Sequence, residues 1–178
     1  MTDTIEYKII IIDSENVIYN NGSNNYDFYV NILEPIRDVY KIKVLYDALS
    51  IPLDNLVNPI SSGSGISNLD TVYINLNDYS RVKSVIINNN IENDLSYFDS
   101  ITIDLNKIKI NTNVDNITMF NDFNVNEADY ILNPIASQLN KINIELRDKN
   151  NNILTKNYAD RFIMKLCIYY KTKKISRF

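Results

Sequence analysis

The sequence contains no histidine and a single cysteine, Cys167. Metal sites that depend on clusters of imidazole or thiolate ligands, such as those for zinc, copper or non-haem iron, are therefore effectively excluded. The same absence excludes a Ser-His-Asp triad and a Cys-His nucleophile pair. A lone cysteine also rules out an internal disulfide framework and fits a reducing compartment. We expect no metal, no cofactor and no catalytic residue, and therefore a protein that is not an enzyme.

Segments typical of secretion or membrane insertion are also lacking. Residues Met1–Glu6 are acidic where the start of a signal peptide is basic. The apolar run Ile9–Ile12 is too short for the core of a signal peptide, and no segment approaches the ~20 apolar residues of a membrane span. We expect a soluble protein that is made in a cytoplasm.

The composition is that of an ordinary globular chain, with 45% hydrophobic and 22% charged residues among 178. A chain of this length buries roughly 70% of its unfolded surface in one domain. The net charge of -4 argues against a general nucleic-acid binder, because such proteins gain affinity largely by neutralising phosphates. We find no linker and no internal repeat, and predict one domain over residues 1–170 with a basic tail over residues 171–178.

Apolar segments separated by polar turns dominate the chain. Ile142, Ile144 and Leu146 alternate with polar residues, which is the period of a strand with one buried face. Similar patterns place strands at Tyr7–Ile12, Tyr26–Ile32, Val39–Tyr46, Thr71–Leu76, Tyr97–Leu105, Tyr130–Leu132, Leu139–Leu146 and Phe162–Tyr170. This set predicts an all-β fold, a single jelly-roll sandwich of about eight antiparallel strands.

Three further expectations concern local structure. Asp78–Val85 is predicted to be a short helix with Asp78 as its cap. Tyr7–Ile12 is apolar throughout, so we expect both of its faces to be covered, one by the core and one by a neighbour or second sheet. Asn55–Asn68 is the longest irregular stretch and is predicted to be a surface loop.

One segment resembles the start of a calcium-binding loop. Asp148, Asn150 and Asn152 place oxygen-bearing side chains at its first, third and fifth positions. Ile153 stands where the turn glycine belongs, and Ala159 where the bidentate glutamate belongs. A hairpin turn explains the segment better. Because this turn has no glycine, an asparagine must supply any position with positive φ.

Other candidate sites have equally simple structural explanations. Ser61–Gly65 contains glycine but no following Lys-Ser or Lys-Thr, so a surface loop is favoured over a phosphate site. A glycosidase would need two carboxylates facing each other in a cleft. The acidic residues are instead scattered, and we expect solvated turn positions for Glu92, Asp94, Asp99, Asp104, Glu127 and Asp129. The thirteen tyrosines lie mostly in strand segments, where packing accounts for them.

The basic segment Lys171–Phe178 has two interpretations. It is either a solubilising tail or an arm that contacts an acidic neighbour, membrane phosphates or nucleic acid.

The order of the segments carries a family resemblance. The residues that carry it are Tyr26–Ile32, Glu34–Val44, Ile51–Pro52, Asp70–Tyr79, Phe98–Ile101 and Leu139–Asp148, with Phe162 opening the closing strand. This succession resembles the single jelly-roll capsid proteins of giant and other large double-stranded DNA viruses, over about Tyr26–Tyr170. The turn after Arg147 departs from the family because it lacks the usual glycine.

The resemblance implies a minor capsid or penton protein that assembles without catalysis. Its implied partners are the major capsid protein, neighbouring minor capsid proteins and copies of itself, as in a pentamer. Its implied location is the virion, after assembly in the host cytoplasm, with no sequence-specific nucleic acid bound. Two alternatives remain: a jelly-roll module that binds carbohydrate or a receptor, and a β-fold enzyme such as a glycosidase.

Overall fold

The computed structural model describes residues 3–22, 24–52, 69–77, 79, 82–85, 94–104, 116–120, 129–148, 150–157 and 159–173. Among these residues, a short 3-10 helix, η1 (Ser14–Asn16), follows the first strand. The strands are β1 (Asp3–Asp13), β2 (Ile18–Tyr19), β3 (Asp27–Pro52), β4 (Leu69–Leu76), β5 (Val82–Val85), β6 (Asp94–Tyr97), β7 (Asp99–Asp104), β8 (Asn116–Phe120), β9 (Asp129–Arg147) and β10 (Arg161–Lys173). No helix in this part of the chain is long and apolar enough to cross a membrane.

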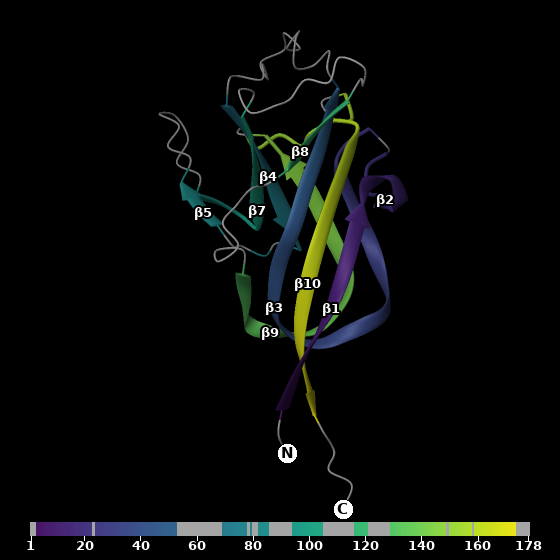
Figure 1. Ribbon diagram of the computed structural model, residues 1–178, viewed down its shortest axis with the longest axis vertical. Helices are drawn as coiled ribbons and strands as arrows, with labels where there is room; N and C mark the ends of the chain where they lie inside the picture. The colour runs from purple at the N-terminus through teal and green to yellow at the C-terminus, as the bar shows by residue number, and fades with distance from the viewer. Residues whose placement is uncertain are drawn as a thin grey trace, which may run out of the picture.

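Eight of these strands form one antiparallel sheet. Its order is β1-β10-β3-β9-β4-β7, and β2 and β8 also pair with β3, while β5 and β6 pair with each other. The sheet curls into a half-barrel that is elongated along the direction of β1 and β10 (Figure 1). The predicted all-β sandwich of about eight antiparallel strands is therefore confirmed.

The curvature comes from two long strands, β3 and β9, which contribute to both sides of the half-barrel. Asp27–Asn31 of β3 pairs with Lys141–Glu145 of β9, whereas the second half of β3 pairs with β10. Between the two halves, the register shifts from Asn31 to Ile36. Asp38 has a φ of 53°, which few residues other than glycine adopt readily. Such irregularities bend a strand and increase its twist, and here they fold one ribbon over its own buried face.

The buried face is formed by alternate residues of the strands. Phe162, Met164, Leu166 and Ile168 of β10 are all fully buried, as the alternation in the sequence predicts. They meet the first half of β3 across the interior, where the rings of Phe28 and Phe162 lie 6.4 Å apart between centroids. Buried aromatic side chains contribute large apolar areas to such cores. Both halves of β3 are thus fixed by one core.

Two sequence predictions about local structure are corrected. Val82–Val85 is strand β5, paired with Asp94–Tyr97, and not the end of a helix; Asp78 lies outside the described residues. A partner strand provides backbone hydrogen bonds, whereas an isolated helix of two turns is marginal in water. The predicted tail also begins too early, because Lys171, Thr172 and Lys173 continue β10 and pair with Ile5, Thr4 and Asp3. The remaining tail residues, 174–178, lie outside the described part.

The expectation for the N-terminal strand is half right. Ile12 is buried, with 1% of its surface exposed, and so one face of β1 meets the core as predicted. The opposite face is not covered by the part of the chain that the structure describes: Ile5, Tyr7, Ile9 and Ile11 keep exposed fractions of 59%, 64%, 47% and 66%. β1 is the edge strand of an antiparallel sheet, and such a sheet can leave one face open to water.

This asymmetry makes neighbouring isoleucines respond differently to a charge. Ile12→Lys should destabilise the fold by several kcal/mol, because its ammonium group would be buried without a partner. Ile11→Lys should change the free energy of unfolding by about 0.5 kcal/mol or less, as surface substitutions usually do. Urea unfolding of both variants measures the difference. Equal losses would show that β1 is covered on both faces.

Candidate assembly surface

The open side of the sheet begins with a row of apolar side chains on β1. We call Ile5, Tyr7, Ile9 and Ile11 the β1 row. Because successive residues of a strand point to opposite faces, all four side chains leave the sheet on the side opposite Ile12. Exposed apolar side chains are common singly, but a contiguous exposed patch marks a surface that binds something.

Aromatic side chains extend this surface across the next two strands. Tyr7 lies opposite Tyr169 of β10, and their ring centroids are 6.0 Å apart. Tyr40 of β3 packs edge-on against Tyr169 at 6.4 Å, and Lys41 Nζ lies 4.3 Å from the centroid of the Tyr169 ring. Lys41 is paired in turn with Ile131 of β9, whose exposed fraction is 69%. The open face therefore reaches across four strands.

Lysine residues are interleaved with these apolar groups. Lys171 and Lys165 lie opposite Ile5 and Ile11, and Lys43 lies opposite the buried Cys167. Their aliphatic stems can cover apolar surface while the ammonium groups stay in water. The open face thus combines apolar area with positive charge in a protein whose net charge is -4. That combination suits contact with another macromolecule better than the binding of a small ligand.

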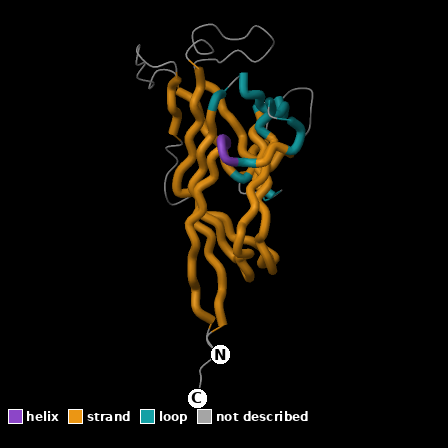
Figure 2. Tube along the Cα trace, turned by 90° about the vertical axis from the view of Figure 1, so that its right-hand side faces the viewer, coloured by secondary structure: helices purple, strands orange, loops and turns teal. Residues whose placement is uncertain are grey.

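The free edge of β1 is a second feature of the same region. β1 is the last strand in the sheet order, and its pairing with β10 runs from Asp3 to Asp13 without a register shift. In the part of the chain that the structure describes, no strand pairs with the other edge of β1. Such an edge presents unpaired N–H and C=O groups to a partner. Figure 2 shows β1 and β10 running side by side toward both chain ends.

Polar contacts hold the edge strand in place at its upper end. Arg161 of β10 binds Asp13 through two hydrogen bonds, of which Nε to Oδ1 measures 3.1 Å, and its Nε lies 3.6 Å from Glu15 Oε2. Asp13 Oδ1 also accepts a hydrogen bond from the backbone N–H of Glu15, which caps η1. The Arg161 guanidinium lowers the pKa of the Asp13 carboxyl below its usual value.

Further contacts hold the lower part of β1. Lys8 Nζ lies 3.2 Å from Glu34 Oε2, and the Tyr170 hydroxyl donates a hydrogen bond of 3.2 Å to Glu6 Oε2. Thr172 Oγ1 donates to Glu6 Oε1 at 3.2 Å. Glu6 and Lys8 thus lie on the side opposite the β1 row. Between Asp3 and Asp13, the outward face of β1 carries only the uncharged side chains of Ile5, Tyr7, Ile9 and Ile11.

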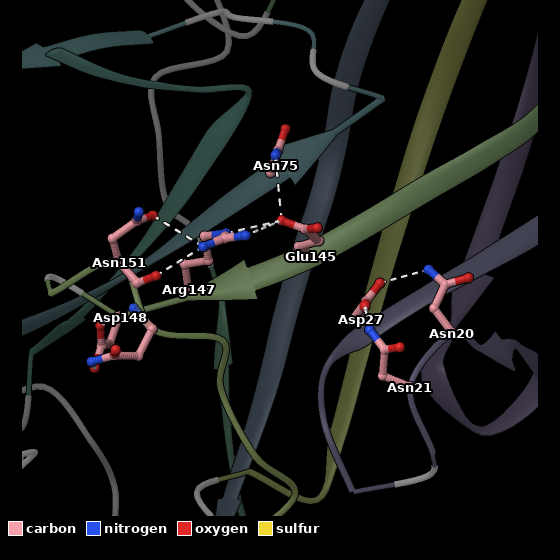
Figure 3. A network of polar contacts seen from close by, with 9 residues as sticks. Asn20, Asn21, Asp27, Asn75, Glu145, Arg147, Asp148 and Asn151 are labelled. Carbon is pink, nitrogen blue, oxygen red and sulfur yellow. Dashed lines mark hydrogen bonds and ion pairs between the residues drawn. The ribbon is translucent and has the colours of Figure 1, made fainter. Parts of the chain in front are cut away.

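The polar networks elsewhere serve the fold. Asp27 is buried and accepts hydrogen bonds from Asn20 Nδ2 at 2.6 Å and Asn21 Nδ2 at 2.7 Å, which fixes the link between β2 and β3 (Figure 3). Arg147 donates to Glu145 Oε2 from Nε at 2.9 Å and from Nη2 at 2.7 Å, and to the Asn151 carbonyl at 2.8 Å. These carboxylates are occupied by partners within the chain.

The segment that resembles a calcium loop is a turn. Asp148 Oδ1 accepts hydrogen bonds from the backbone N–H groups of Asn150 and Asn152, both at 2.8 Å. Asn151 has a φ of 67°, which confirms that an asparagine supplies the left-handed position that the missing glycine would have taken. Among the described residues, no group of three or more acidic or cysteine side chains could hold a metal ion.

The remaining candidates lie largely outside the described part of the chain. That is true of Ser61–Gly65, of Glu92 and of Glu127. For Asp94, Asp99, Asp104 and Asp129 the structure describes the strand backbone but not the side chain. Their interpretation as solvated residues stays a prediction.

Comparison with known proteins gives no family for this chain. No protein-family model matches it, and no curated protein matches it.

The sequence analysis did not predict the open face, because a run such as Ile9–Ile12 does not reveal which of its residues point away from the core. A signal was present, however: Glu6 and Lys8 alternate with Ile5, Tyr7 and Ile9, which indicates two different faces.

The Asp13–Arg161 pair predicts a pH dependence. Since the folded-state pKa of Asp13 is lowered, its carboxylate stabilises the fold above the unfolded-state pKa near 3.8, and this contribution is lost as pH falls through the folded-state value. Asp13→Asn should therefore be less stable than wild type at pH 6, and the difference should shrink at pH 2.5. Because the pair is partly exposed, we expect a difference of about 0.5–1 kcal/mol in urea unfolding.

Asp160→Asn provides a control of opposite sign. Burial raises the pKa of Asp160, so its carboxylate costs stability that returns on acidification. As the pH falls, the free energy of unfolding of wild type should therefore increase relative to that of Asp160→Asn. A wild-type advantage over Asp13→Asn that grew on acidification would contradict the assignment.

Proposed function

We propose that this protein is a structural component of the icosahedral capsid of a large double-stranded DNA virus, and that it acts through assembly with other proteins. The observation that carries the proposal is the open face of β1, β10, β3 and β9, with its contiguous apolar and lysine side chains. A surface of this kind is costly on a protein that works alone, because it invites association. On a shell protein it is the contact surface.

The viral part of the proposal rests on the order of sequence segments described above. Under it, the partners are the major capsid protein, neighbouring minor capsid proteins and copies of this chain, and the location is the virion after assembly in the host cytoplasm. The order of sequence segments is compatible with a penton and with a minor capsid protein. The basic residues of the open face and of the predicted tail suit an acidic neighbour.

The physical mechanism is the repetition of modest contacts. A half-barrel held by one core is a stiff unit, and closed symmetry lets each copy make the same contacts with its neighbours. No chemical step is involved, so the relevant residues are those that set contact area and charge. Ile131 and the β1 row supply exposed apolar area, and the lysines beside them oppose unspecific stacking of this face on itself.

The aromatic row favours a second candidate function, a module that binds carbohydrate or a receptor. Tyr7, Tyr169 and Tyr40 lie in sequence across three strands, with consecutive centroids 6.0 and 6.4 Å apart. Tyrosine rings with an apolar body and a polar tip suit sugars as well as proteins. A panel of sugars, with and without calcium, that raises the melting temperature would favour this function over a capsid role.

The capsid proposal predicts assemblies larger than a dimer. Light scattering and electron microscopy over increasing protein concentration should show rings or curved sheets. Rings of five copies would identify a penton, whereas open sheets would identify a position between major capsomers. Ile131→Lys should raise the concentration needed for these assemblies about tenfold, because it places a charge within an apolar contact.

Ile18→Lys is the matched control. Ile18 is 49% exposed on β2, which pairs with Phe28 and Tyr29 of β3 and not with β1 or β10, so this variant should assemble like wild type. A wild-type protein that never exceeds a dimer would contradict the proposed function, and equal effects of both variants would remove the open face from it.

A further inference from the structure

The free edge of β1 has properties that natural edge strands usually avoid. Native proteins protect such edges with prolines, bulges, short strands and charged side chains, including charges that point inward. The inward charges of β1, Glu6 and Lys8, have partners within the chain. β1 is an eleven-residue strand with no proline, it pairs with β10 without a bulge, and its outward side chains from Ile5 to Ile11 are all apolar. An edge of this kind is a template for another strand.

We propose that the β1 edge binds the β1 edge of a second copy of this chain, antiparallel and about a two-fold axis, so that the two sheets become one. The inference rests on the proposed function in that it names one contact of an assembling protein. A two-fold axis makes the contact isologous, which means that every contact between two different residues occurs twice. The backbone groups of each edge then satisfy those of the other.

The geometry limits the register of this pairing. A two-fold axis perpendicular to the sheet keeps the outward side chains of both copies on one face. Residues that oppose each other must therefore both be odd-numbered or both be even-numbered. Because the hydrogen-bonding direction of a strand also alternates with period two, any such register aligns the free N–H and C=O groups of both edges.

The charges of β1 select among the allowed registers. With Tyr7 opposite Tyr7 of the second copy, Glu6 opposes Lys8 at two symmetric positions, and Ile5 opposes Ile9 on the open face. Shifting the axis to Lys8 would oppose two lysines, and shifting it to Glu6 would oppose two glutamates. An axis at Ile9 would oppose both Glu6 and Lys8 with isoleucines. The Tyr7 register is thus the one among these four that pairs opposite charges.

The contacts within the chain are compatible with this register. Glu6 accepts hydrogen bonds from Tyr170 and Thr172, and Lys8 lies 3.2 Å from Glu34, whose side chain is 86% exposed. A carboxylate accepts several hydrogen bonds and an ammonium group donates three, so each charge has capacity for a partner in the second copy. In the Tyr7 register the paired segment of each copy runs from Asp3 to Ile11. Asp13 lies outside this segment and keeps its ion pair with Arg161.

Charge exchange tests the register. Sedimentation velocity of dilute wild-type protein should show a monomer–dimer equilibrium. Glu6→Lys and Lys8→Glu should each raise the dimer Kd about tenfold, because each turns two attractive pairs into repulsive ones. The double variant with both changes should return Kd to within about threefold of wild type. Glu34→Gln removes the partner of Lys8 within the chain and should leave Kd unchanged, and melting temperatures check that every variant is folded.

Cross-linking gives an independent test. In a Cys167→Ala background, Tyr7→Cys places two cysteines opposite each other, within the Cα distance of about 4.4–6.8 Å that a disulfide requires. Oxidised glutathione should convert this variant to a covalent dimer. Ile9→Cys in the same background should form little covalent dimer, because residue 9 opposes Ile5 and not residue 9 of the second copy. Equal yields from both variants would overturn the register.

The outcomes separate this proposal from the proposed function. Dimers that show the charge rescue, without any larger assembly, would support the edge contact and reject the capsid role. Larger assemblies that are unaffected by the changes at Glu6 and Lys8, with no cross-link at Tyr7→Cys, would reject the edge contact and leave the capsid role. A wild-type protein that is monomeric at all concentrations would overturn both.

Discussion

The structure depends on the pairing of β3 with β9, two strands that are too long to belong to one side of a sandwich. A flat sheet buries neither of its faces, so the chain must cover one face with another layer. The register shift between Asn31 and Ile36 lets this one pair of strands turn over and supply both sides. β10 and β4 then attach to opposite ends of the bent ribbon, and the residues between them form a single core.

In this arrangement β1, the strand at one end of the sheet, has one face on the core and an apolar face that is exposed. β1 completes the core with Ile12 and packs Ile10 against it, yet Ile5, Tyr7, Ile9 and Ile11 point outward. Arg161 and Asp13 at one end, and Tyr170, Thr172 and Glu34 toward the other, hold the strand against fraying. An edge strand that was meant to be mobile would not need these contacts at both ends. Contacts of Glu6 and Lys8 on the inner side, and of Asp13 at the end of the strand, therefore stabilise an apolar surface on its outer side.

The sequence predicted those features that depend on local periodicity. The alternation of Phe162, Met164, Leu166 and Ile168 predicts a strand and its buried face, and the lack of glycine after Arg147 predicts the left-handed asparagine at 151. The joining of two predicted strands into β3 was missed, because Pro35 resembles a break although prolines are tolerated at bulges. The short helix was wrong because Val82–Val85 finds a partner that is distant in sequence. The open face was missed for the same reason, since exposure on β1 depends on the order of strands in the sheet.

The open face and the free edge are different kinds of contact surface, and use of one leaves the other available. The edge offers backbone hydrogen bonds in the plane of the sheet, whereas the face offers apolar side chains perpendicular to it. A two-fold edge contact by itself closes at the dimer, because each copy has one β1. A shell requires a second, different contact that continues from dimer to dimer. The side chains from Tyr7 across to Ile131 point out of the plane of the sheet, so they can make this contact while the β1 edges are paired. Two orthogonal surfaces on one stiff half-barrel are therefore the minimum that the proposed assembly needs, and β1 takes part in both.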